Sequence, residues 1–303
     1  MSVRNLLRTL SLVIGVSSAS LNFAQTAEDD KLGQQLIDAG NRTVKVVIEK
    51  FSPGASPELR ELLTPQKIRV IVAADFNAFA DYKNRRILLP AQFVGECAAQ
   101  AQAMMLVFRD PSLKPKYMRW QKYLAERSER SRQKFLAGKT LVDDERVIDF
   151  WQFARMSSQP VLTDKENFVV EQMMIDALGL VIGHELGHLL LSHKPYREIS
   201  PATSRRQEFE SDEYARKLMK KADMQVLPGL MLAYVRFMQF EGEGPASDFA
   251  KSHPPAHCRF YEIGRKELLE MADADGAKEQ MEKMGSSVSK IKDLIRALRD
   301  ECR

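Results

Sequence analysis

The chain contains few of the residues that usually hold metals or disulfides. Among 303 residues there are only five histidines, three cysteines and two tryptophans. The cysteines are Cys97, Cys258 and Cys302, an odd number, so at most one internal disulfide can form, and the sequence does not choose the pair. No two of them have Cys-x-x-Cys spacing, which argues against a zinc site built from cysteines.

Strong net charge is also missing. The formal charge is +4, with 44% hydrophobic and 28% charged residues, which is an ordinary globular composition. Such a balance excludes wholesale disorder and gives no basis for a nucleic-acid partner, which would normally meet a concentrated basic face. Internal repeats are absent as well. We therefore expect one large domain over residues 30–303.

Long hydrophobic runs are absent beyond the N-terminal segment. The most apolar later stretch, residues 178–191, is interrupted by His184, Glu185 and His188. We expect no transmembrane segment in the mature chain, which leaves peripheral association with a membrane open.

The first residues have the layout of a secretory signal peptide. Arg4 and Arg8 precede an apolar run over residues 10–21, and small residues follow near Ala24 and Ala27. The run is too short to cross a hydrocarbon core of about 30 Å as a helix. We predict that residues 1–24 form a signal peptide and that the protein is exported; the alternative is an uncleaved anchor.

The remaining pattern indicates an α+β fold that is mainly α-helical. Residues 68–75 and 85–91 are rich in branched residues and predict two strands around a turn-prone segment. Helices are expected over 96–108, over 168–192, from Ser204, and after Arg259 and Gly276. Residues 111–160 read as a basic helical insertion, either a lid or partner-binding arm or an ordinary amphipathic helix with a solvated charged face.

Three of the five histidines lie in the apolar stretch VIGHELGHLLLSH, residues 181–193. His184 and His188 are four residues apart, which places them on one face of a helix, where both imidazoles can reach one zinc ion at about 2.0–2.1 Å. Glu185 lies beside the first of them, where it can take a proton from a water activated by the metal. The alternative is a structural histidine pair, but buried polar side chains are costly without partners.

A catalytic zinc site usually has a third protein ligand. Glu208 is the preferred candidate, and Asp212, one helical turn later, is placed to hold a ligand imidazole through its second nitrogen. His193 is the other candidate, although it lies about 140° around the helix from His188. Glu210 and Glu213 are expected to be solvated surface charges.

HELGH followed by EFESDEYA resembles the zinc metalloendopeptidases that include HtpX, the CAAX prenyl endopeptidases and their periplasmic relatives. These enzymes are gluzincins, which carry an HExxH motif followed by an ExxxD motif. FNAFADYKNRRILLP and SHPPAHCRFYEI are similar to two further family segments, so the resemblance covers residues 65–265 with a break. It implies one zinc per chain on His184, His188 and Glu208, with Glu185 as base and Asp212 as support. It also implies a zincin-type domain with a small sheet, whose edge strand near the active site, at Ile87, Leu88 and Leu89, pairs with the substrate peptide.

The chain departs from this family in its basic insertion and in having neither HtpX-type membrane helices nor tetratricopeptide repeats. These departures favour a soluble exported protease over one acting on prenylated proteins. We therefore predict a zinc endopeptidase of the bacterial periplasm that acts on misfolded or misassembled envelope proteins. The alternative is a non-catalytic or chaperone-like peptide-binding module, against which the intact Glu185 argues.

His253 is a further catalytic candidate. It begins the segment HPPAH, in which two prolines stiffen the loop. Three roles are open: stabilising the oxyanion, occupying the fourth coordination position of the metal, or a structural hydrogen bond.

Overall fold

The computed structural model describes residues 27–71, 78–136, 148–240 and 254–273. The predicted signal peptide, His253, Cys302 and the helix expected after Gly276 lie outside these ranges. The elements, in chain order, are α2 (Ala27–Phe51), α3 (Pro57–Leu62), β1 (Ile68–Ile71), β2 (Phe79–Asp81), β3 (Arg86–Pro90), α4 (Ala91–Arg109), α5 (Lys114–Leu136), α6 (Phe150–Phe153), α7 (Asp164–Leu190), α8 (Pro201–Lys221), α9 (Val226–Phe240) and α11 (Ala256–Asp273), with short 3-10 helices at Pro111–Leu113 and Tyr196–Glu198.

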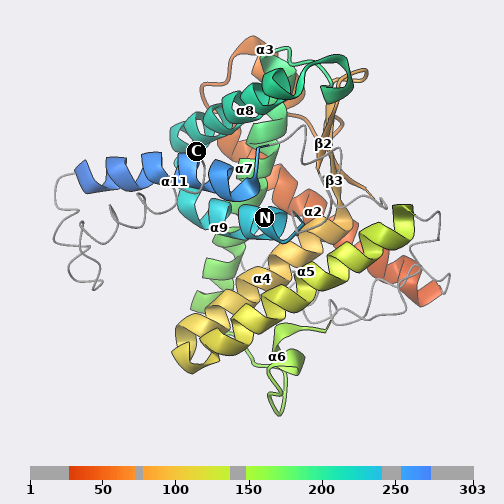
Figure 1. The fold of residues 1–303 in the computed structure, drawn as a ribbon, viewed down its shortest axis with the longest axis vertical. Coiled ribbons are helices and arrows are strands. Elements are labelled where there is room, and N and C mark those ends of the chain that lie inside the picture. The colour runs from red at the N-terminus through yellow and green to blue at the C-terminus, as the bar shows by residue number, and fades with distance from the viewer. Residues whose placement is uncertain (1–26, 72–77, 137–147, 241–253, 274–303) are drawn as a thin grey trace.

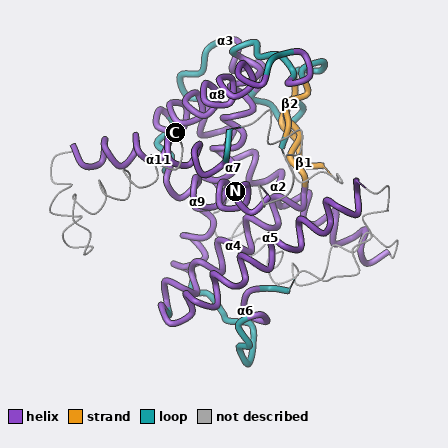
Figure 2. The backbone as a smooth tube through the Cα atoms, in the orientation of Figure 1, coloured by secondary structure: helices purple, strands orange, loops and turns teal. Residues whose placement is uncertain are grey.

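Helices make up most of the described chain, and the strands gather on one side of it (Figure 2). The three strands form one mixed sheet in the order β1-β3-β2. The predicted α+β, mainly helical fold is therefore confirmed.

Helix α7 runs through the middle of the molecule, with the sheet to one side and α9 and α11 to the other (Figure 1). Its start is a capping box, in which Thr163 and Glu166 satisfy each other's backbone N–H groups. In the described part of the chain, α7 is the one helix long and apolar enough to cross a membrane. However, 89% of its most apolar window is buried inside the protein.

Helices α7 and α8 pack closely because two glycines of α7 face small residues of α8. A Cβ atom at Gly183 would lie 3.0 Å from the Cα atom of Ala215, and one at Gly187 would lie 2.9 Å from that of Ser211. Such distances leave no room for a side chain. The glycines that weaken α7 as a helix thus permit the close approach of the two helices that carry the site.

The sheet corrects one prediction. Segment β3 pairs in parallel with β1 and antiparallel with β2, so it is the central described strand and not an edge. Ile87, Leu88 and Leu89 are all buried. Consecutive apolar residues are typical of a strand covered on both faces, and the prediction that they form the edge strand beside the active site was wrong. Among the described strands, β2 lies at that edge and contacts α7.

The basic helix α5 buries an apolar face in a second, smaller core. Trp120 is fully buried, and its indole N–H donates a hydrogen bond of 2.8 Å to the carbonyl oxygen of Ile148. Phe150 packs on the same ring, with the two centroids 5.6 Å apart. These contacts agree with an amphipathic helix; a role as a lid or partner-binding arm stays a prediction.

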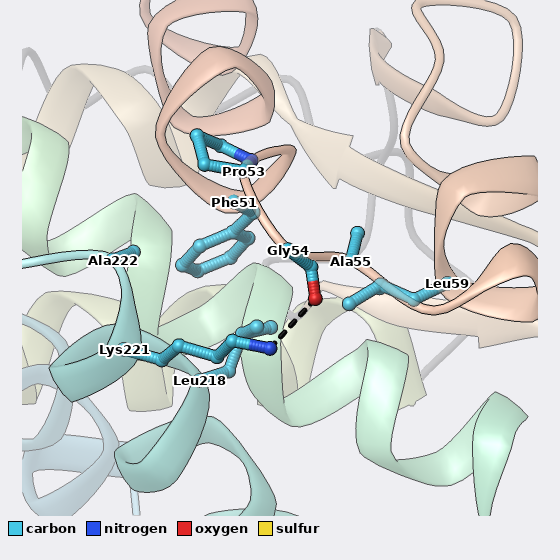
Figure 3. A pocket seen from close by; sticks show the side chains of 8 residues that line it. All are labelled: Phe51, Pro53, Gly54, Ala55, Leu59, Leu218, Lys221 and Ala222. Atoms are coloured by element: carbon cyan, nitrogen blue, oxygen red, sulfur yellow. Dashed lines mark hydrogen bonds between the residues drawn. The ribbon is translucent and has the colours of Figure 1, made fainter.

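A small pocket lies where the turn between α2 and α3 meets the end of α8 (Figure 3). Lys221 donates a hydrogen bond of 2.6 Å to the carbonyl oxygen of Gly54, whose φ of +68° suits glycine. Lys221 is thirteen residues beyond Glu208 on α8, about 20 Å along the helix. This pocket is therefore separate from the histidine cluster.

Candidate metal centre

Two histidines of α7 and one glutamate of α8 converge in the buried space between the helices. The Nε2 atoms of His184 and His188 are 3.0 Å apart. Each lies 3.4 Å from an oxygen of Glu208, His184 from Oε2 and His188 from Oε1. The potential ligand atoms all lie within 4.8 Å of one another, so the three side chains could hold one metal ion.

Asp212 of α8 and Arg259 of α11 support this cluster. Asp212 Oδ1 lies 2.8 Å from Nδ1 of His184, as predicted. Arg259, near the start of α11, donates to both oxygens of Asp212, from Nε at 2.8 Å and from Nη2 at 2.6 Å. Its Nη1 is 3.1 Å from Oε2 of Glu208. One buried guanidinium thus connects two acidic residues of α8, Glu208 and Asp212, to α11.

Glu185 lies in the same buried region, beside the edge strand β2. The backbone N–H of Ala80 donates a hydrogen bond to its carboxylate. Burial raises the pKa of Glu185 to about 7, against the opposing effect of a charged His184. Tyr82, just after β2, is close enough to feel the charges of Glu185 and Glu208, which add to burial in raising its pKa. A carboxyl group poised near neutrality is suited to accept and return a proton.

Charges within the cluster compensate one another. Burial and the Arg259 guanidinium oppose protonation of His184, but Asp212 and Glu208 outweigh them and raise its pKa to about 9. Burial alone would raise the pKa of Glu208 and of Asp212, yet Arg259 and His184 hold both well below their usual range, and His188 also lowers that of Glu208. Burial lowers the pKa of His188. Both carboxylates are therefore charged at neutral pH.

His193 lies on the other side of His188 from Glu208. Its Nδ1 is 3.1 Å from Nδ1 of His188, and its Nε2 is 3.1 Å from Oε2 of Glu210. Ser211 Oγ lies 3.3 Å from Nδ1 of His193. His193 therefore lies outside the group of side chains that could hold the ion. This agrees with the prediction that Glu208, and not His193, is the third ligand. Glu210 is exposed, as expected of a surface charge, and it also meets His193.

Glu213 also has specific partners. Its carboxylate accepts hydrogen bonds from Arg216 at 3.1 Å and from Lys266 of α11 at 2.8 Å. For Glu213 the prediction of a solvated surface charge was wrong, because α11 packs over this side of α8.

The structure thus brings together His184, Glu185, His188, Glu208 and Asp212. It places Ile87, Leu88 and Leu89 in the central strand instead, and His253 lies outside the described residues. Arg259 was expected only as a residue at a helix start, and no role was assigned to Tyr82 or Ser211. The sequence feature that could have pointed to Arg259 is its position in SHPPAHCRFYEI, which resembles a family segment. That segment does not indicate which residues the arginine contacts.

The fold and the site define a mainly helical α+β protein whose central helix carries a His/Glu cluster able to hold a metal ion. The chain belongs to the peptidase U49 family, whose model matches residues 99–281, more than half of its length. The match includes both helices that carry the cluster, so the protein is assigned as a peptidase. No curated protein and no solved structure matches it.

Proposed function

We propose that the protein is a zinc-dependent endopeptidase with one zinc ion per chain, held by His184, His188 and Glu208. The observation that carries the proposal is the convergence of two imidazole nitrogens and a buried carboxylate within 4.8 Å, beside Glu185. Two histidines and one glutamate are a donor set typical of catalytic zinc, with a coordination position left for water or substrate.

The donor atoms fit such an ion. Both imidazoles turn their Nε2 atoms toward the same point, while Asp212 holds the opposite nitrogen of His184 at 2.8 Å. An imidazole held at one ring nitrogen presents the other to a metal. Glu208 is charged despite its burial, as a ligand must be.

Zinc bound here would polarise a peptide carbonyl and activate a water for attack on it. Glu185 would take the proton of that water and deliver it to the nitrogen of the leaving amine, and a pKa near 7 suits both transfers. Asp212 and Arg259 would keep His184 and Glu208 in place while charge develops.

The edge strand β2 offers a place for the substrate backbone. It lies directly beside Glu185, to which Ala80 donates a hydrogen bond. Phe79 at its start is partly exposed. An extended peptide that adds to β2 would gain backbone hydrogen bonds independent of its sequence, which suits cleavage of unfolded polypeptides. This assigns to β2 the role first expected for Ile87–Leu89.

The wider setting of the proposal is export to the bacterial periplasm and action on misfolded envelope proteins. The signal-peptide pattern of residues 1–24 supports export. The resemblance of HELGH and EFESDEYA to the HtpX-like and CAAX prenyl endopeptidase-like gluzincins supports the envelope role and the zinc chemistry.

Metal removal tests the proposed function on the unaltered protein. We expect a chelator to abolish cleavage of an unfolded polypeptide and one equivalent of zinc per chain to restore it. The readouts are the cleavage rate and the zinc content before and after chelation. Unchanged cleavage by a protein shown to contain no metal would contradict the proposal.

A further inference from the structure

The two proposed zinc ligands of α7 are held from behind in different ways. His184 meets a carboxylate directly, with its Nδ1 2.8 Å from Oδ1 of Asp212. His188 meets another imidazole, with its Nδ1 3.1 Å from Nδ1 of His193. His193 in turn reaches a carboxylate, with its Nε2 3.1 Å from Oε2 of Glu210. Each ligand histidine is thus backed by an acidic residue of α8, and one of the two links is indirect.

The backbone at the end of α7 makes the indirect link achievable. The helix ends at Leu190, and Ser192 adopts a φ of 55°. The N–H of His193 then returns to the carbonyl oxygen of His188 at 3.0 Å. This left-handed turn folds the His193 side chain back under the helix. The side chain is only 5% exposed, and its ring stands edge-on to that of His188, with centroids 5.1 Å apart.

One arrangement of protons satisfies all these contacts when His188 ligates through Nε2. His188 must then carry its proton on Nδ1 and donate it to Nδ1 of His193. His193, which accepts there, must carry its own proton on Nε2 and donate it to Glu210. Glu210 as a carboxylate accepts at the end of the chain. Every donor therefore meets an acceptor from the ligand nitrogen to the protein surface.

We propose that His193 is a positioning residue that, with Glu210, sets the tautomer and ring orientation of the zinc ligand His188. The inference rests on the proposed zinc centre and adds to it a second support, separate from Asp212. Hydrogen-bonded partners of ligand histidines typically contribute 10–100-fold to metal affinity. A residue that only filled space would contribute by shape and not by its acceptor nitrogen.

The test compares His193→Leu with His193→Asn in the full-length protein. Both replacements are close in size, but the amide oxygen of asparagine lies near the position of Nδ1 and can still accept from His188. The zinc Kd of each protein is measured by competition with a chromophoric chelator. The absorption spectrum of the cobalt-substituted protein reports the ligand geometry independently of activity.

We expect His193→Leu to weaken zinc binding by about 10–100-fold and to shift the cobalt spectrum, whereas His193→Asn should recover most of the affinity. Glu210→Gln should weaken zinc binding several-fold. It provides a second test of the inference if His193→Leu does not fold. Glu198→Gln makes the same change at an exposed site in the α7–α8 connection, and it should behave like the wild type.

Wild-type zinc affinity and an unchanged cobalt spectrum in both His193→Leu and Glu210→Gln would overturn the inference. Equal losses in the leucine and asparagine variants would also overturn it, because they would indicate packing alone. A wild-type protein that binds no zinc would instead overturn the proposed function, a result distinct from either.

Discussion

Substituting glutamine for Glu185 should lower the rate of peptide cleavage by about 10²–10⁴-fold, the usual contribution of a general acid–base group. Glutamine is close in size to glutamate but cannot accept and return a proton at neutral pH. Zinc content should stay at the wild-type level, because the proposed ligands are His184, His188 and Glu208. The measurement is the cleavage rate of an unfolded polypeptide, with zinc determined on the same samples.

Glu171→Gln is the matched control for this substitution. Glu171 is also buried in α7, but it lies fourteen residues before Glu185, about 21 Å along the helix. Its substitution should leave the cleavage rate close to that of the wild type. Full activity in Glu185→Gln would rule out the role of Glu185 as base. Equal binding of extended peptides by both variants, with no cleavage by the wild type, would favour a peptide-binding module.

Replacing Arg259 with leucine should destabilise the fold by about 3–5 kcal/mol, the range for removing one partner from a buried ion pair. The guanidinium is buried and lies against two buried carboxylates, with Nη2 at 2.6 Å from Asp212 and Nη1 at 3.1 Å from Glu208. Without it, two negative charges would face each other inside the protein. The measurement is the free energy of unfolding in urea, made with chelator present so that loss of metal does not contribute.

Arg265→Leu provides the comparison on the same helix. Arg265 contacts Glu262 at 3.3 Å, and about a third of each side chain is exposed. Such partly exposed pairs contribute at most about 1 kcal/mol. Arg259→Lys should fall between the two, because a single ammonium cannot reproduce the bidentate contact with Asp212. Equal losses in the two leucine variants would show that Arg259 is not a central electrostatic support.

Much of the candidate site could be predicted because helical periodicity determines it locally. The spacing of four residues from His184 to His188 places both imidazoles on one face of α7, whatever the rest of the fold does. The same spacing places Glu208 and Asp212 together on α8. Which face of α8 meets α7 depends on close packing at Gly183 and Gly187. The two glycines are visible in the sequence, but the residues that pack against them are not.

The parts that could not be predicted depend on contacts between distant segments. Strand order is one case, since β3 has the composition of a strand but its two neighbours are set by the tertiary fold. His193 is another, because helical geometry extended past Leu190 places it away from His188, whereas the turn at Ser192 brings it back. Asp212 and Glu208, the carboxylates that Arg259 contacts, lie 47 and 51 residues earlier in the chain, beyond the reach of any local pattern.

The zinc content of a Glu208→Ala variant tests the central claim most directly, because it joins the predicted ligand set to the observed cluster. Elemental analysis should find one zinc per chain in the wild-type protein and in Glu198→Ala, an exposed control in the α7–α8 connection. It should find less than about a tenth of that in Glu208→Ala, since a carboxylate ligand is lost from a three-residue site. Full zinc occupancy in Glu208→Ala, or no zinc in the wild type, would contradict the account.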